Sequence, residues 1–350
     1  MPRSNTSASG SDDEPGFGAV FDEPEGFRPT TPPPTVRTYT RRALGGGGGP
    51  LVGDETVQVG LVSGHPLWGH VLYPAAIALA RFLELHAEQL LHAPDGTGKG
   101  KGKGKAVLEL GAGGGLPGLV AALEGAGDVV ISDFPDPALV NNIAKNIELN
   151  VASLKSDEVA ATVAKGFTWG TPPDPLLEAL SPSGSGSESE GQPPPPPPRR
   201  FDLILLSDLV FNHSQHVALL KTCLSCLSTP PTTSRRVLPQ SEPGVTPLPP
   251  APTPATTAAA AAATTATEAE QVVDFSDPST LQTPAVLCFF SHHRPWLVDA
   301  DLDILNLARQ TGWLVNKVWE DKHAGPAFPE DGGDLGIRST VHGWMFTRTP

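Results

Sequence analysis

Apolar residues along this chain follow two spacings, which alternate. Continuous apolar runs of about the length of a buried strand lie at 107–110, 128–133, 201–208 and 285–290. Apolar residues spaced as on one face of a helix lie at 74–92, 119–123, 137–151, 213–227 and 299–310. Strands that alternate with helices predict an α/β fold, in which a mostly parallel sheet carries helices on both faces.

The end of the chain departs from this alternation. The segments 313–320 and 341–348 are predicted strands, and an acidic loop rich in glycine and proline joins them without a helix. Two strands without a helical crossover predict an antiparallel hairpin at the sheet edge. Two shorter patterns add a hairpin or edge strand at 56–61, from alternation, and a helix at 157–165.

Low-complexity stretches interrupt the pattern. Residues at about 94–105 alternate glycine and lysine, 181–200 end in a proline run, and 228–284 are rich in proline, threonine and alanine. Such compositions need not pack into a core. Residues 1–50 are polar and lack periodicity, so we expect a largely disordered N-terminal tail. We therefore expect one domain over 51–350, with the three stretches as insertions.

The composition limits the class of partner. Lysine and arginine number 24 against 38 acidic residues, a net charge of −14, which disfavours nucleic acid and anionic lipid and favours a basic partner. The three cysteines suggest a reducing compartment. An apolar leader and a stretch able to span a bilayer are both missing from the sequence. We expect a cytoplasmic monomer.

A glycine loop follows the first buried strand. The pattern Glu109-x-Gly111-x-Gly113-x-Gly115 leads from this strand into a helix, whose first N–H groups point at whatever lies above the strand. The next strand ends about 20 residues later in Asp133, at the spacing used to hold a ribose by its hydroxyls. The sequence therefore predicts a nucleoside-binding site.

Two ligand classes use such a loop. A dinucleotide places its pyrophosphate on the helix N-terminus, and an acidic group at the end of the strand would oppose it. S-adenosylmethionine has no phosphate and carries a positive sulfonium, so the acidic Glu109 favours this second ligand. A tight turn that binds no ligand is the remaining alternative, and three alternating glycines argue against it.

Further candidates lie near other strand ends and in loops. The stretch 207–212 follows a predicted central strand, at the edge where α/β sheets bind ligands. Trp68 and Trp169 stand in loops and either pack in the core or contact the ligand, Trp169 by stacking on adenine. His213 and His216, one turn apart, are interpreted as capping or packing residues, and Cys223-x-x-Cys226 as inert packing. We expect no metal site.

The strongest clue is a resemblance to a known family. Its motifs are HPLWGH at 65–70, LELGAGGGLP at 108–117, SDFPDP at 132–137 and SDLVFNHSQH at 207–216. Together they resemble a fungal group of class I methyltransferases that act on translation elongation factor 1-alpha, once described as nicotinamide N-methyltransferases. The resemblance covers most ordered segments from about residue 57 to 348. It does not cover the tail or the insertions.

The resemblance implies a Rossmann-like sheet of seven strands, S-adenosylmethionine as methyl donor, and methylation of the N-terminal glycine and adjacent lysine of the elongation factor. It also implies roles for particular residues. Asp208 and Phe211 match an acid-x-x-aromatic motif that lines the acceptor channel, and are the catalytic candidates. With Glu109 added from the loop pattern, the donor-binding candidates are Trp68, Glu109, Gly111, Ala112, Gly113, Asp133, Trp169 and Ser207.

Other functions stay open at this point. A small-molecule N-methyltransferase, for example one acting on nicotinamide, would share every donor-site feature. A nicotinamide-dependent oxidoreductase would use the glycines 113, 115 and 118, and both Glu109 and the C-terminal hairpin argue against it. A catalytically idle scaffold with the same fold would not need Glu109, Asp133 and Asp208 together.

Overall fold

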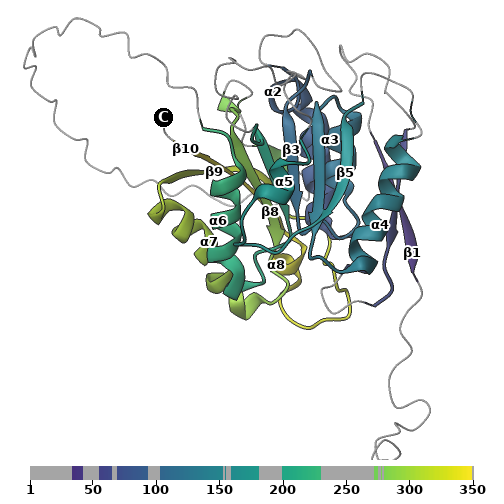
Figure 1. Ribbon diagram of the computed structural model, residues 1–350. Helices are drawn as coiled ribbons and strands as arrows, with labels where there is room; N and C mark the ends of the chain where they lie inside the picture. The colour runs from purple at the N-terminus through teal and green to yellow at the C-terminus, as the bar shows by residue number, and fades with distance from the viewer. Residues whose placement is uncertain are drawn as a thin grey trace, which may run out of the picture.

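The computed structural model describes residues 34–41, 55–64, 69–93, 103–152, 154, 159–180, 199–229, 272–274, 277 and 280–348. Its main feature is a sheet in the strand order β5-β4-β3-β6-β8-β10-β9-β7. Five strands are parallel: β3 (Ala106–Leu110), β4 (Asp128–Asp133), β5 (Ala161–Gly166), β6 (Leu203–Ser207) and β8 (Ala285–Ser291). Figure 1 shows them side by side in the middle of the molecule.

The C-terminal hairpin completes the sheet. Strand β10 (Val341–Arg348) lies antiparallel between β8 and β9 (Trp313–Asp321), as the missing helical crossover predicted. With the five parallel strands, the hairpin makes the mostly parallel sheet of seven strands that the resemblance implied. An eighth, β7 (Val272–Asp274), pairs antiparallel with β9 at the edge and lies inside the predicted 228–284 insertion. Part of that stretch therefore belongs to the sheet.

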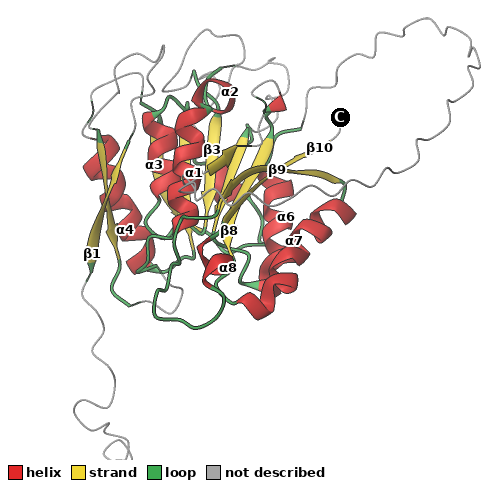
Figure 2. Cartoon of the chain, turned by 180° about the vertical axis from the view of Figure 1, so that it is seen from behind, coloured by secondary structure: helices red, strands yellow, loops and turns green. Residues whose placement is uncertain are grey.

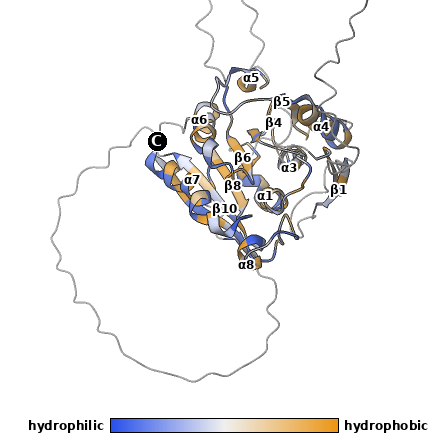
Figure 3. Cartoon of the chain, turned by 90° about the horizontal axis from the view of Figure 1, so that it is seen from below, coloured by the Kyte–Doolittle hydropathy of each residue, from blue (hydrophilic) through white to orange (hydrophobic). Residues whose placement is uncertain are grey.

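Helices cover both faces of the sheet, as predicted (Figures 2 and 3). One core cluster joins one face of the sheet to α1 (Pro74–Leu85), α2 (Ala87–Leu90), α3 (Leu116–Leu123) and α4 (Pro137–Ile147). A second cluster joins the other face to α5 (Asp174–Leu177), α6 (His216–Cys226) and α7 (Val298–Gln310). Neighbours along a strand alternate between the clusters, Val107 with the first and Leu108 with the second, because strand side chains alternate between faces.

Two predictions were wrong in the first half of the chain. The helix expected at 157–165 is instead strand β5 from Ala161 onward, paired along its whole length with β4. A short stretch is a weak guide to its own structure when a neighbouring strand offers hydrogen bonds. Within the expected tail, β1 (Thr35–Thr40) pairs antiparallel with β2 (Thr56–Leu61) beside α4. The remaining tail positions, 1–33 and 42–50, lie outside the described residues.

Helical predictions were confirmed with altered ends. The helix expected over 74–92 is interrupted at His86, between α1 and α2. The helix expected over 137–151 ends as a π-helix, Glu148–Ala152. Short helices that were not predicted are α5, Pro295–Leu297 and α8 (Leu335–Ser339). Helix α8 lies in the loop between β9 and β10, which was expected to contain no helix. In the described part of the chain, every helix is too short or too polar to cross a bilayer.

Candidate active site

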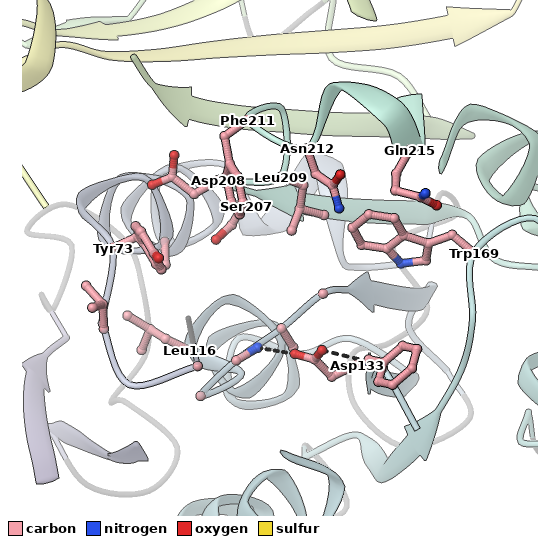
Figure 4. Close-up of a pocket in the computed structure, with 18 of the residues that line it drawn as sticks. Tyr73, Leu116, Asp133, Trp169, Ser207, Asp208, Leu209, Phe211, Asn212 and Gln215 are labelled. Carbon is pink, nitrogen blue, oxygen red and sulfur yellow. Dashed lines mark hydrogen bonds between the residues drawn. The ribbon is translucent and has the colours of Figure 1, made fainter. Parts of the chain in front are cut away.

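A pocket of about 880 Å³ opens at the C-terminal ends of β3, β4 and β6 (Figure 4). This is the sheet edge at which parallel α/β folds bind ligands. The predicted site residues that line the pocket are Gly111, Ala112, Gly113, Asp133, Trp169, Ser207, Asp208 and Phe211. Glu109 is missing from the lining, and Trp68 lies outside the described residues.

The glycine loop is shaped by left-handed backbone angles. Gly111, Gly113 and Gly115 have φ values of 60°, 56° and 78°, which side chains rarely tolerate. A Cβ on Gly111 would also lie 2.6 Å from Leu209 Cδ2. The loop is therefore restricted to glycine at these positions, and its backbone lies bare against the pocket.

Asp133 closes the loop from the end of β4. Its Oδ2 accepts a hydrogen bond from the Gly113 amide at 2.7 Å, and its Oδ1 accepts one from the Phe134 amide at 2.6 Å (Figure 4). Two backbone donors fix the orientation of this carboxylate on the pocket wall. A carboxylate held in this position can accept hydrogen bonds from ribose hydroxyls.

Glu109 lies beneath the loop and not in the pocket. It is 1% exposed, and its Oε2 accepts a hydrogen bond from the Gly118 amide in the first turn of α3 at 2.8 Å. Burial, with a smaller contribution from the charge of Asp133, raises the pKa of Glu109 to about 8 although the Gly118 bond lowers it. Glu109 was expected among the donor-binding residues, and the structure instead places its side chain inside the core, where it supports the loop.

Asp208 follows β6 with a strained backbone. Its φ is +55°, the only positive value of a non-glycine residue in the described ranges. Its amide donates to Phe289 O at 2.8 Å, and its Oδ1 accepts from the Ser291 amide at 3.1 Å. Oδ1 also lies 3.1 Å from Nε2 of His293. Asp208 therefore bridges the ends of β6 and β8 on the pocket wall.

Aromatic rings surround the outer side of Asp208. The His293 ring lies 5.5 Å from Tyr73, 5.6 Å from Phe328 and 6.4 Å from Phe211, measured between ring centres. Figure 4 shows Tyr73, Asp208 and Phe211 in the same part of the pocket. Burial and the nearby Asp208 charge raise the pKa of Tyr73 above its usual value, so its hydroxyl is un-ionised at neutral pH.

Three of these residues were missed at the sequence level. His293 follows β8, so its position at a strand end was a usable signal. Tyr73 precedes α1, and Phe328 belongs to the loop between β9 and β10. Neither has a local pattern that indicates a site.

The opposite wall of the pocket carries Trp169. This residue follows β5 in the loop after Phe167, and Figure 4 places it beside Asn212 and Gln215. Trp169 Cζ2 would lie 3.0 Å from a Cβ on Gly111, so the indole closely approaches the glycine loop. The ring can therefore stack on a flat ligand that rests on this loop.

The histidine and cysteine candidates have partners in the protein. His213 Nε2 lies 2.8 Å from Asp301 Oδ1, and His216 Nε2 lies 2.7 Å from the Val210 carbonyl. Cys223 and Cys226 are buried in the core, and burial raises the pKa of Cys226 to about 11. A group of three or more metal-ligating side chains is not found among the described residues.

The pocket fits S-adenosylmethionine. The space beside Gly113 is open to a ligand, Asp133 suits ribose hydroxyls, and Trp169 suits adenine. The Gly113 amide already donates its hydrogen bond to Asp133 Oδ2, so it does not present this N–H to a pyrophosphate. The arrangement therefore matches S-adenosylmethionine better than a dinucleotide.

Comparison with known proteins agrees with this assignment. Residues 63–179 match the lysine methyltransferase family. The chain is 32% identical to the protein N-terminal and lysine N-methyltransferase EFM7 of Schizosaccharomyces pombe, over 95% of each protein. It is 34% identical to EFM7 of Cryptococcus neoformans, over 82% of this chain and 74% of that protein. It is 32% identical to EFM7 of Neurospora crassa, over 93% of this chain and 86% of that protein. The chain belongs to the family of protein N-terminal and lysine N-methyltransferases and uses S-adenosylmethionine as its methyl donor.

Proposed function

We propose that this enzyme methylates the N-terminal glycine and the adjacent lysine of translation elongation factor 1-alpha. The observation that carries the proposal is one pocket lined by both carboxylates, Asp133 on the donor side and Asp208 on the acceptor side. The names of the relatives support a protein amine as acceptor. The sequence motifs support the elongation factor as the protein that carries it.

The donor side of the pocket has a defined set of contacts in this proposal. Asp133 accepts hydrogen bonds from the ribose, Trp169 stacks on the adenine, and Ser207 lines the floor next to the glycine loop. Glu109 holds the loop from below through Gly118. The bound donor supplies a methyl group on a positively charged sulfur, which is already an activated leaving group. The protein therefore mainly positions the acceptor and excludes water.

The acceptor must present a neutral nitrogen. A free α-amine has a pKa near ~8, so removing its proton at neutral pH costs about 1 kcal/mol. A lysine amine, with a pKa near ~10.4, costs about 4–5 kcal/mol. An N-terminal amine therefore needs little help from a general base, whereas the neighbouring lysine needs more.

Asp208 and Phe211 handle the amine in this proposal. Asp208 accepts a hydrogen bond from the acceptor nitrogen and orients its lone pair toward the donor side of the pocket. Phe211 narrows the channel and offers an aromatic face to the methylated, cationic product. Tyr73, un-ionised at neutral pH, adds a second aromatic surface without adding negative charge.

The domain and its location complete the proposal. We propose one methyltransferase domain over 51–350, against which β1 of the expected tail also packs, with low-complexity stretches inserted at about 94–105, 181–200 and 228–284, of which β7 joins the sheet. The residues 94–102, 181–198 and 230–271 lie outside the described residues. The proposed substrate acts in translation, so the enzyme works in the cytoplasm, and we propose that it does so as a monomer.

Mass spectrometry tests the acceptor directly. The unmodified elongation factor is incubated with enzyme and S-adenosylmethionine, and its N-terminal peptide is fragmented. The expected result is methylation on the glycine α-amine and the adjacent lysine. A parallel reaction offers nicotinamide as acceptor. Methylation of nicotinamide with an unmodified peptide would contradict the proposal and favour a small-molecule enzyme.

Asp208→Asn tests the acceptor role. Asparagine tolerates positive φ well, so the backbone at this position is preserved while the negative charge is lost. We expect kcat/KM for the peptide to fall about 100-fold. Donor affinity measured by calorimetry is expected to stay within about twofold, because the donor contacts lie on the other side of the pocket. Unchanged turnover would refute the role of Asp208.

A further inference from the structure

Only one of the two carboxylate oxygens of Asp208, Oδ1, accepts hydrogen bonds from the described residues. It is 3% exposed, and Oδ1 accepts from the Ser291 amide and lies 3.1 Å from His293 Nε2. Oδ2 is buried and has no hydrogen-bond partner in the described structure. An unpaired buried oxygen is unfavourable, and a donor entering the pocket would satisfy it. Asp208 lines the pocket, so Oδ2 becomes an acceptor for one N–H group when a bound ligand displaces the atoms that cover it.

His293 is built into this arrangement. Its side chain is 11% exposed and is enclosed by Tyr73, Phe211 and Phe328. Nε2 faces a carboxylate oxygen, so this nitrogen carries a hydrogen and donates a hydrogen bond to Oδ1. Rotation of the carboxylate would break both bonds to Oδ1. His293 and Ser291 together therefore fix the carboxylate with Oδ1 paired and Oδ2 left for a ligand.

The net charge of the Asp208–His293 pair depends on whether His293 is protonated. With a neutral imidazole the pair carries one negative charge, which attracts an ammonium group and accepts its N–H at Oδ2. With a protonated imidazole the pair is neutral overall, and the added positive charge repels a cationic amine. We infer that His293 is a positioning residue for the acceptor amine, which orients Asp208 and, by its protonation, switches the amine site on and off. This inference rests on the proposed function.

The surrounding charges determine the pH at which this occurs. Asp208 faces His293 from the end of β6, Tyr73 from the segment before α1, Asp301 from α7, and Arg294 from the next position in the chain. Burial and Arg294 lower the pKa of His293, but the charge and hydrogen bond of Asp208, with Asp301, outweigh them and raise it. The amine site is therefore present above this raised pKa and is lost as the pH falls through it.

Two substitutions separate orientation from titration. His293→Gln keeps an N–H donor but cannot be protonated, whereas His293→Phe keeps a ring and loses the donor. The assay measures kcat/KM from pH 5.5 to 9 with a Gly-Lys peptide from the N-terminus of the elongation factor. Below both pKa values the wild type is expected to lose about 100-fold per pH unit, because both the amine and His293 take up protons.

The variants are expected to differ in defined ways. His293→Gln should lose only about tenfold per pH unit, since only the amine still titrates, and should keep most of the activity at pH 9. His293→Phe should lose about 10-fold to 100-fold at every pH. Calorimetry with S-adenosylmethionine should give the wild-type dissociation constant for both, which shows that they fold. His323→Gln is the control, because His323 is exposed on the loop between β9 and β10.

Nuclear magnetic resonance tests the pair without any substrate. The imidazole pKa of His293 should lie above the ordinary histidine value in the wild type and fall below it in Asp208→Asn, because burial and Arg294 then outweigh Asp301. Equal pKa values in the two proteins, or a His293→Gln variant with the wild-type acid limb, would overturn the inference. A wild type that methylates no such peptide would overturn the proposed function, and the role in amine positioning with it.

Discussion

At the residue scale, the two pocket carboxylates differ in how the backbone holds them. Asp133 is fixed by two amide donors from its own loop region, Gly113 and Phe134. Asp208 is fixed by the neighbouring strand, through Ser291, and has a strained φ. Strain of this kind costs about 1–3 kcal/mol and persists only where the surroundings enforce it. In the proposed function, the rigid carboxylate contacts the donor and the strained one contacts the acceptor.

Asp133→Ala tests the donor side. The variant loses a charged hydrogen-bond acceptor for the ribose and frees the Gly113 amide. A hydrogen bond to a charged group contributes about 1.5–3 kcal/mol, so the dissociation constant for S-adenosylmethionine should rise about 10-fold to 150-fold. Titration calorimetry measures it. Asp303→Ala, an exposed position on α7, is the control, and equal affinities for the two variants would count against the ribose contact.

Burial of Glu109 is expected to make the free energy of unfolding depend on pH. Its folded-state pKa is raised to about 8 from an ordinary value of 4.5. For a carboxyl group with a raised pKa, its stabilising contribution is complete below 4.5 and is lost as the pH rises through 8. The melting temperature of the wild type should therefore fall between pH 7 and pH 9 by more than that of Glu109→Gln, which keeps the acceptor for Gly118. Parallel pH profiles would show that Glu109 does not titrate in this range.

At the scale of elements, asparagines attach α4 and its π-helical end to strand β2. Asn142 and Asn146 both donate to the Gly60 carbonyl, at 2.7 and 2.9 Å. One turn further, Asn150 exchanges two hydrogen bonds with the Gln58 backbone. Their spacing of four residues places them on one face of the helix. These amides substitute for a neighbouring strand along the second edge of β2 and so limit unpaired backbone there.

Asn146 extends this contact to the glycine loop. Besides its donation to Gly60, its Nδ2 donates to the Gly114 carbonyl at 2.9 Å, and its Oδ1 accepts from the Gly60 amide at 2.9 Å. Asn146→Ala would leave buried backbone groups unpaired, at a cost of about 2–3 kcal/mol. The melting temperature should drop by roughly 4–12 °C. Asn141→Ala, exposed on the same helix, should change it by less than about 1 °C. Equal shifts would contradict the bridging role.

At the scale of the whole molecule, net charge determines how the enzyme meets its substrate. The chain carries −14 at neutral pH, which favours the approach of a basic protein. The long-range part of this attraction is screened within about 8 Å at physiological salt. Charge therefore assists association with a folded substrate more than binding of a short peptide.

Salt dependence tests this attraction. Raising the salt from about 0.05 M to 0.5 M should increase KM for the elongation factor roughly fivefold or more. The rate at saturating substrate should change little, because salt screens the approach of the two proteins and not the contacts of the bound complex. A short N-terminal peptide serves as the comparison and should show a smaller effect. The same KM at both salt concentrations would exclude charge steering.

Much of the fold and of the donor site followed from local pattern. Strand β4 and the glycine loop lie where the sequence predicted them, since a buried strand, a tight turn and a helix each depend on neighbouring residues. Predictions failed where pairing with a distant segment decided the structure. Strand β5 forms because β4 offers it a ladder of hydrogen bonds. In the same way, β1 forms because it pairs with β2.

The acceptor side depended on the tertiary structure. By itself the sequence determined the alternation of elements, the donor loop, and Asp133 and Asp208 at strand ends. Only the folded chain decided that His293, with Tyr73 and Phe328 against its ring, would lie beside Asp208, and that Glu109 would be buried beneath the loop. The reason is geometric, because parallel strands bring their C-terminal ends to one edge of the sheet. Residues far apart in the sequence therefore meet there, and no local sequence pattern indicates that they will.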